Sequence, residues 1–159
     1  MELLNQILLV IQPTVGSILT SGFSRFDQKW YNSLKKPGLT PPNFVFPIAW
    51  TILYILLGVN ALLIYNSTKT KNRPSIMNKE FKNYLVIYEI QLILNFVWGW
   101  VFFGLKNLKL ALAIVVIMIL LTIYLLVQSW KINRVAFWLL VPYFVWISFA
   151  SYLNFSIAF

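Results

Sequence analysis

The feature that most constrains the fold is a series of apolar runs, each long enough to cross a lipid bilayer. A helix rises 1.5 Å per residue, so about 20 residues span the roughly 30 Å of hydrocarbon. Backbone hydrogen bonds must be satisfied within the segment there, which favours helices. The sequence therefore predicts an all-α integral membrane protein with five transmembrane helices, at residues 3–24, 44–66, 82–104, 108–130 and 134–158.

The connections between these runs indicate one bundle. Residues 105–107 and 131–133 leave so little chain that the helices on either side must be antiparallel neighbours. Two longer connections, 25–43 and 67–81, are rich in Lys, Arg and Pro and are predicted to be solvated. We expect a single domain over 1–159. The 13 Lys and Arg divide almost evenly between the two ends of the bundle, so they leave its orientation in the membrane open.

Composition excludes several classes of function. The basic residues, which give a net charge of +9, lie in short groups between apolar runs, where they can meet lipid head groups of the bilayer; no nucleic-acid partner is predicted. The chain has no Cys and no His, so thiolate chemistry and the commonest metal ligands are absent. We therefore predict no metal site and no resident cofactor. Conventional hydrolytic catalysis also lacks its usual residues.

The connection 25–43 contains Pro37, Pro41 and Pro42 together with Lys35 and Lys36. Each proline fixes φ, so this segment should be stiff and should lose little entropy on covering a ligand. Two interpretations stay open from the residues alone. The segment is either a lid whose cationic residues, including Arg25, meet an anionic ligand, or a short loop whose lysines meet lipid phosphate.

Aromatic residues recur at helical spacing beneath this segment. Phe46, Trp50 and Tyr54 are four residues apart and share one face of the second helix. The third and fifth helices carry similar series of aromatic, amide and small residues: Gln91, Asn95, Trp98 and Phe102 in the third, and Tyr143, Trp146, Ala150, Leu153 and Asn154 in the fifth. Such stripes are typical either of plain helix packing or of a pocket. The amides should point inward, where hydrogen bonds between helices are the alternative explanation to a ligand site.

Other conspicuous residues have simpler interpretations. Trp30, Trp130 and Trp138 are typical of aromatic anchors at the membrane interface. Glu89 is the carboxylate inside a predicted span, which makes it a functional candidate. Its position a turn or two from the helix end favours contact with head groups or with Lys82.

The chain resembles the tryptophan-rich sensory protein and translocator protein family, the TspO family. The resemblance covers nearly the whole sequence and is carried by motifs in the first loop and in the second, third and fifth helices: Ser24-Arg25-Phe26, Trp30-Tyr31, Lys36-Pro37, Pro41-Pro42, Trp50, Leu53-Tyr54, Gly58, Gln91-Leu92, Leu94-Asn95, Trp98, Phe102-Phe103-Gly104, Pro142-Tyr143, Trp146, Phe149-Ala150 and Leu153-Asn154.

This resemblance implies five helices around a pocket capped by the first loop, commonly in a homodimer. It implies binding of porphyrins such as protoporphyrin IX and of isoquinoline-carboxamide molecules. Ten positions are implied as the ligand-binding walls, five in each: Tyr31, Pro41, Phe46, Trp50 and Tyr54, facing Asn95, Trp98, Trp146, Ala150 and Leu153. Some bacterial relatives degrade protoporphyrin in light, and the resemblance assigns the catalytic role to Trp50 and Trp146.

Two departures from the family pattern stand out. The basic residue of the sterol-recognition segment in animal members is missing from the C-terminal Ser156–Phe159, and Leu110 replaces a Trp. The Lys-, Asn- and Ile-rich composition and the lack of a targeting extension favour a bacterial plasma membrane. The alternative to a tetrapyrrole-binding sensor or translocator is a membrane scaffold that acts through partners and binds ligands incidentally.

Overall fold

The computed structural model describes residues 2–21, 27–68 and 79–159, with the side chains of 2 and 19–21 left undescribed. The described part of the chain is helical: α1 Glu2–Ser21, α2 Gln28–Ser33, α3 Val45–Thr68, α4 Lys79–Gly99, the π-helix η2 Trp100–Gly104, α5 Leu108–Ile132 and α6 Arg134–Ala158. The predicted helix 134–158 coincides with α6, and the other predicted bounds within these ranges differ from the observed ones by three residues or fewer. The linker residues Lys69, Lys71 and Arg73 lie outside the described residues, as does Arg25.

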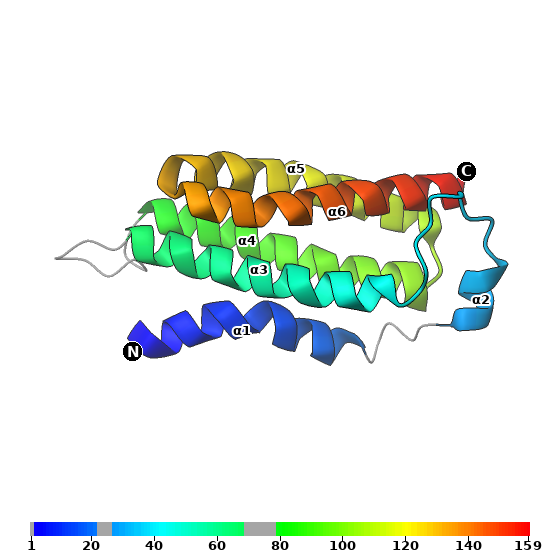
Figure 1. Cartoon of the computed structure of the whole chain (residues 1–159), viewed down its shortest axis with the longest axis horizontal. Coiled ribbons are helices and arrows are strands. Elements are labelled where there is room, and N and C mark those ends of the chain that lie inside the picture. Colours follow the sequence, from blue (N-terminus) through cyan, green and yellow to red (C-terminus); the bar gives the residue numbers. More distant parts are fainter. Residues whose placement is uncertain (1, 22–26, 69–78) are drawn as a thin grey trace.

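The long helices lie side by side along one axis, and helices that follow one another in the chain run in opposite directions (Figure 1). Helix α1 packs along α3, while α4, α5 and α6 complete the bundle. The short α2 lies across the end of the bundle where the C-terminus is found. This helix is a correction to the sequence analysis, which treated 25–43 as a loop throughout.

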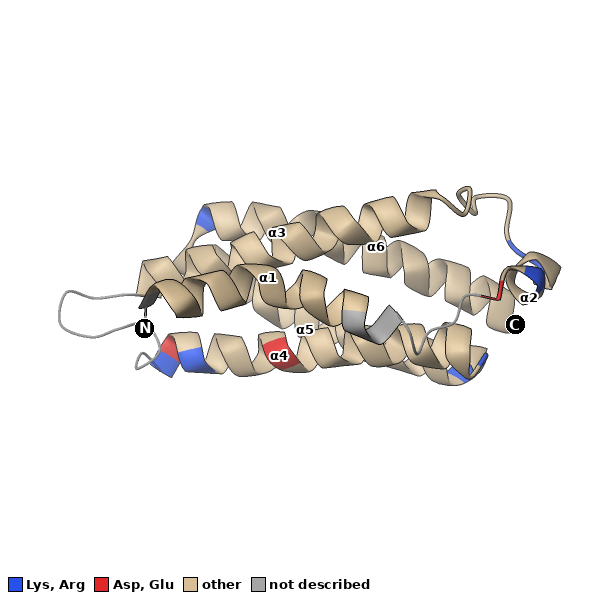
Figure 2. Ribbon diagram, turned by 90° about the horizontal axis from the view of Figure 1, so that it is seen from below, with Lys and Arg blue, Asp and Glu red and all other residues tan. Residues whose placement is uncertain are grey.

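Four helical segments of the described chain are long and apolar enough to cross a membrane: 45–68, 79–104, 108–132 and 134–158. In α1 the apolar part that is described, Leu3–Ile18, is shorter. Charged residues gather near the two ends of the bundle, apart from an acidic position partway along α4 (Figure 2). The protein is therefore an α-helical membrane protein.

Asparagine side chains form both tight turns. Asn107 Oδ1 accepts the backbone N–H of Leu110 at 3.1 Å at the start of α5. Asn133 ends α5 by donating its N–H to Ser129 O at 2.8 Å, and its Oδ1 caps α6 by accepting from Val135 and Ala136. One residue therefore serves both helix ends, and α5 and α6 pack closely against each other.

A buried polar cluster joins the half of the bundle away from α2. Asn60 Nδ2 donates to Ala136 O at 2.8 Å, and Tyr84 OH donates to Asn60 Oδ1 at 2.5 Å. The Tyr84 hydroxyl also lies 3.3 Å from Ser129 Oγ. These contacts connect α3, α4, α5 and α6, and they satisfy polar groups that have no water to bond in a membrane interior.

Helix α1 is held against the bundle by one close approach and two polar contacts, one of which is an exposed hydrogen bond from Gln6 Nε2 to Asn66 Oδ1 of α3 at 3.2 Å. A Cβ added to Gly58 of α3 would lie 2.3 Å from Val10 O, so the two backbones nearly touch. Gln12 Nε2 donates to Glu89 Oε2, which joins α1 to α4. The sequence analysis did not foresee this partner of Glu89, because it belongs to α1, which packs against this face of α4.

Candidate functional site

A cavity of about 790 Å³ opens between the helices at the α2 end of the bundle. Its size falls within the range of small-molecule pockets. Side chains from α1, α2, α3, α4, η2 and α6, with two from the connection after α2, surround it: Ser17, Ile18, Gln28, Tyr31, Asn43, Phe44, Phe46, Pro47, Trp50, Thr51, Tyr54, Asn95, Phe96, Trp98, Gly99, Phe102, Phe103, Ala150, Leu153, Asn154 and Ile157. Most of this lining is apolar, so the cavity suits a largely hydrophobic molecule.

Most of the residues predicted for the two walls are brought together here. Eight of them line the cavity: Tyr31, Phe46, Trp50, Tyr54, Asn95, Trp98, Ala150 and Leu153. Pro41 and Trp146 do not line it. Pro41 lies in the connection after α2, and Trp146 is covered by the ring of Phe46, whose centroid is 5.9 Å away, and by that of Trp50 at 6.4 Å.

Trp50 is the centre of an aromatic cluster at the cavity wall. Its ring stacks on Tyr54 at a centroid distance of 5.6 Å and lies 6.0 Å from Trp98. Tyr143 and Trp146 meet it edge-on from α6 at 6.5 and 6.4 Å. Edge-on and offset contacts of this kind are the favourable geometries for aromatic rings. The cluster therefore holds the Trp50 indole in place with one part of it against the cavity.

A chain of hydrogen bonds fixes the polar end of the site. Tyr54 OH donates to Asn95 Oδ1 at 2.8 Å, and Asn95 Nδ2 donates to Tyr143 OH at 2.8 Å. Gln91 Nε2 donates to the same hydroxyl at 2.8 Å. Asn154 Nδ2 donates to Leu108 O at 2.8 Å. The predicted inward direction of all three amides is confirmed, and each makes a hydrogen bond between helices.

Helix α2 forms the roof. Tyr31 is only 4% exposed and meets Phe46 edge-on at 6.3 Å, and its burial raises the pKa of the phenol. Lys36 folds back onto this residue: its ammonium donates to Tyr31 O at 3.0 Å and lies 4.2 Å from the ring centroid. Lys36, expected to offer its charge to a ligand, is thus engaged within the roof, whereas Lys35 is exposed.

The three tryptophans predicted to be interfacial anchors lie in two different settings. Trp130 and Trp138 are exposed at the opposite end of the bundle from α2. Trp30 instead lies in α2 and packs edge-on against Phe102 at 6.0 Å, so it is part of the contact between roof and bundle.

The family model for TspO/MBR matches residues 7–159. The chain belongs to the TspO/MBR family. Among relatives, the tryptophan-rich protein TspO of Chlorobaculum tepidum is 33% identical over 160 residues, which is 97% of this chain and 97% of the relative. The tryptophan-rich sensory protein of Cereibacter sphaeroides is 33% identical over 89% of this chain and 82% of its own. The human translocator protein is 26% identical over 92% of this chain and 84% of its own.

Within this TspO/MBR chain, the cavity includes residues that the sequence analysis did not assign to it. Pro47 and Thr51 flank the Trp50 face of α3, and Phe102 and Asn154 continue series already noted in α4 and α6, so helical spacing could have found them. Ser17 and Ile18 of α1 could not be found this way. Their place depends on how α1 docks against α3, for which the sequence of α1 carries no aromatic or amide series.

Proposed function

We propose that this TspO/MBR protein binds a tetrapyrrole, protoporphyrin IX being the best candidate, in the cavity beneath α2. The observation that carries the proposal is the aromatic lining of the cavity, in which Tyr31, Trp50 and Trp98 come from three different elements. A flat conjugated macrocycle gains from stacking and edge contacts with such rings. The lack of His and Cys in the chain favours the metal-free ring, because no strong axial ligand is available.

The anionic propionates of the ligand would lie toward the α2 end. Lys35 is exposed there and is the roof cation that we expect to meet them. Isoquinoline-carboxamide molecules would use the same apolar walls. The relatives named as sensory and translocator proteins support a role in sensing or carrying such a ligand.

We propose that α1 is a fifth transmembrane helix. It lies along α3 for most of the length of the bundle, its described apolar part ends close to the cavity, and its outward side chains from Leu3 to Ile18 are apolar. The bundle would then cross the membrane five times, in a bacterial plasma membrane. A homodimer remains a prediction from the resemblance.

Light-dependent degradation of the bound porphyrin, with molecular oxygen as the oxidant, is a second proposed activity. It is favoured by the oxidisable indole of Trp50 in the cavity wall, with Trp146 directly behind it. Illuminating the complex in air should bleach the Soret band, and Trp50→Phe should slow the bleaching. A Soret band that persists in light as it does in the dark would exclude this activity.

Binding can be tested by titrating protoporphyrin IX into the purified protein and following both Trp quenching and the Soret shift. We expect the double variant Trp50→Phe plus Trp146→Phe to bind about tenfold more weakly, since losing the Trp50 indole at the cavity wall together with the Trp146 ring that supports it should cost roughly 1.4 kcal/mol. The matched control is Trp130→Phe plus Trp138→Phe, which removes two exposed indoles at the far end of the bundle. A wild-type protein that shows no binding, or equal Kd values in both double variants, would favour the scaffold alternative.

A further inference from the structure

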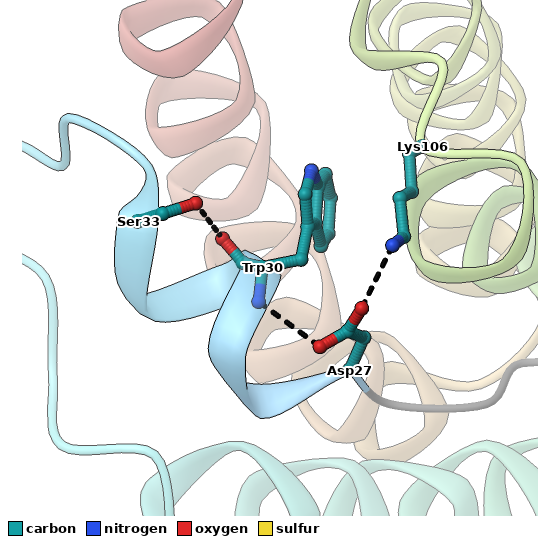
Figure 3. Close-up of polar contacts among 4 residues, drawn as sticks. All are labelled: Asp27, Trp30, Ser33 and Lys106. Carbon is teal, nitrogen blue, oxygen red and sulfur yellow. Dashed lines mark hydrogen bonds and ion pairs between the residues drawn. The ribbon is translucent and has the colours of Figure 1, made fainter.

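The Asp27 carboxylate has two partners, one on each oxygen (Figure 3). Oδ1 accepts the backbone N–H of Trp30 at 3.0 Å and so caps α2. Oδ2 forms an ion pair with Lys106 Nζ at 2.8 Å. Lys106 belongs to the turn between η2 and α5, far along the chain. One side chain therefore both starts the roof helix and attaches it to the bundle.

Lys106 adopts an unusual backbone conformation. Its φ is 53°, and among the described residues other than glycine it alone has a positive φ. This left-handed region is disfavoured for residues with a Cβ, and Gly or Asn is the usual occupant. A lysine kept in such a position indicates that its side chain has a use there that compensates for the strain.

The pair is connected to the cavity through aromatic contacts. The Lys106 ammonium lies 5.3 Å from the centroid of the Trp30 ring, which packs edge-on against Phe102. Phe102 lines the cavity, as does Tyr31, the residue next to Trp30 in α2. If α2 moves away from Lys106, Tyr31 must leave the cavity with it.

We propose that Asp27 and Lys106 form an electrostatic latch that sets how often α2 opens from over the cavity, and thereby how fast the cavity exchanges its ligand. The claim that the latch sets how often α2 opens concerns the chain alone. The claim that it sets the rate of ligand exchange rests on the proposed ligand-binding function. The described segments place no other acidic side chain against Lys106, so the attraction at this point of the roof depends on Asp27.

The strength expected of this latch suits a roof that must open. The two side chains are 40% and 43% exposed, and exposed ion pairs are modest and screened by salt. Loss of the pair should therefore raise the population of the open roof by about fivefold, the upper end for such pairs. A buried pair would close the site more firmly but would also slow ligand release.

Two variants separate the latch from simple structural support. Asp27→Asn keeps a good N-cap for α2 while removing the charge. Lys106→Gly removes the cation and also relieves the strained φ, so its thermal stability should equal or exceed that of the wild type. The control is Lys29→Gln, which removes one exposed charge of α2 that is not part of the pair.

Amide hydrogen exchange of the peptide covering 27–34, followed by mass spectrometry on the ligand-free protein in nanodiscs, measures opening directly. After correction for intrinsic exchange, we expect about fivefold faster exchange in Asp27→Asn and Lys106→Gly, and wild-type exchange in Lys29→Gln. Raising the salt from 0.01 M to 1 M should speed the wild type toward the two variants and leave the variants unchanged. Unchanged exchange in both variants, or a wild type insensitive to salt, would overturn the latch.

Protoporphyrin IX dissociation, measured by stopped-flow displacement, tests whether the latch sets the rate of ligand exchange. The same two variants should release the porphyrin about fivefold faster than the wild type does. Faster exchange of 27–34 with unchanged porphyrin release would refute the link to the ligand. Absence of porphyrin binding in the wild type would refute the proposed function and that link together, while the exchange data would still decide whether the latch exists.

Discussion

Gly58 provides the sharpest test of how α1 is attached. In the native structure, a Cβ at this position would lie 2.3 Å from Val10 O and 3.0 Å from Val10 C and Cα. Ordinary contacts begin near 3.4 Å. The obstructing atoms are backbone, so no side-chain rotation relieves the contact. Gly58→Ala should therefore push α1 away from α3 by about 1 Å, toward the separations at which close-packed membrane helices lose contact.

Two opposing effects set the magnitude. Alanine is favoured over glycine in a helix interior by about 1 kcal/mol. Overpacking typically costs about 1–3 kcal/mol, and a clash with rigid backbone belongs near the upper end. The displacement of α1 also strains its hydrogen bond from Gln12 to Glu89. We therefore expect a net loss of about 1–2 kcal/mol in the free energy of unfolding, because the steric term exceeds the propensity term.

Reversible unfolding in mixed micelles, followed by circular dichroism, measures this loss. Gly38→Ala is the matched control, since nothing lies within 4 Å of a Cβ there and its φ is not positive. The control should be neutral or stabilised by up to about 1 kcal/mol. Equal stabilities for Gly58→Ala and Gly38→Ala would show that α1 is not held by this close approach.

Three further outcomes are expected. Tyr143→Phe removes the hydroxyl that accepts from two buried amides, and it should lower the free energy of unfolding by about 1–2 kcal/mol in the same assay; no loss would show that the amides find other partners. Asn60→Leu removes the amide that the Tyr84 hydroxyl and Ala136 O share, and it should cost about 1–3 kcal/mol, whereas Asn66→Leu, which loses only an exposed hydrogen bond from Gln6, should cost little. The hydrogen bond from Lys106, and to a lesser extent that from the Trp30 N–H, lowers the pKa of Asp27 below its ordinary 3.8. The ionised carboxylate therefore stabilises α2 above that pH. This contribution to stability is lost as the pH falls through the lowered pKa. Amide protection of 27–34, corrected for intrinsic exchange, should thus be constant between about pH 7 and 5 and decline below about 4; Asp27→Asn should show no such decline.

Much of the fold could be predicted because the membrane imposes it. A run such as 108–130 has no alternative to a helix at that length and hydropathy, and Asn107 and Asn133 place its ends. Helix α2 could not be predicted in the same way. Its six residues contain no apolar run, and the helix depends on the Asp27 cap and on packing of Trp30 against η2.

The candidate site, too, could be predicted only in part from the sequence. Spacing of four residues placed Phe46, Trp50 and Tyr54 on one face, because residues that share a helical face also share a neighbour. Spacing could not reveal that the ring of Trp146 would lie behind that of Trp50, since this depends on how α6 is rotated against α3. The partner of Glu89 was missed for a related reason: it comes from α1, whose docking depends on Gly58.

No described residue of α5 lines the cavity, although this helix packs along both α4 and α6. Helix α5 therefore contributes to the scaffold alone, whereas α3, α4 and α6 contribute both to the scaffold and to the cavity. Conservative apolar changes on the outward side of α5, at positions such as Val116 and Leu120, can alter how the protein meets lipids or neighbouring proteins without altering what it binds. A fluorophore or affinity handle placed on that helix would report on the bundle while leaving the pocket chemically untouched.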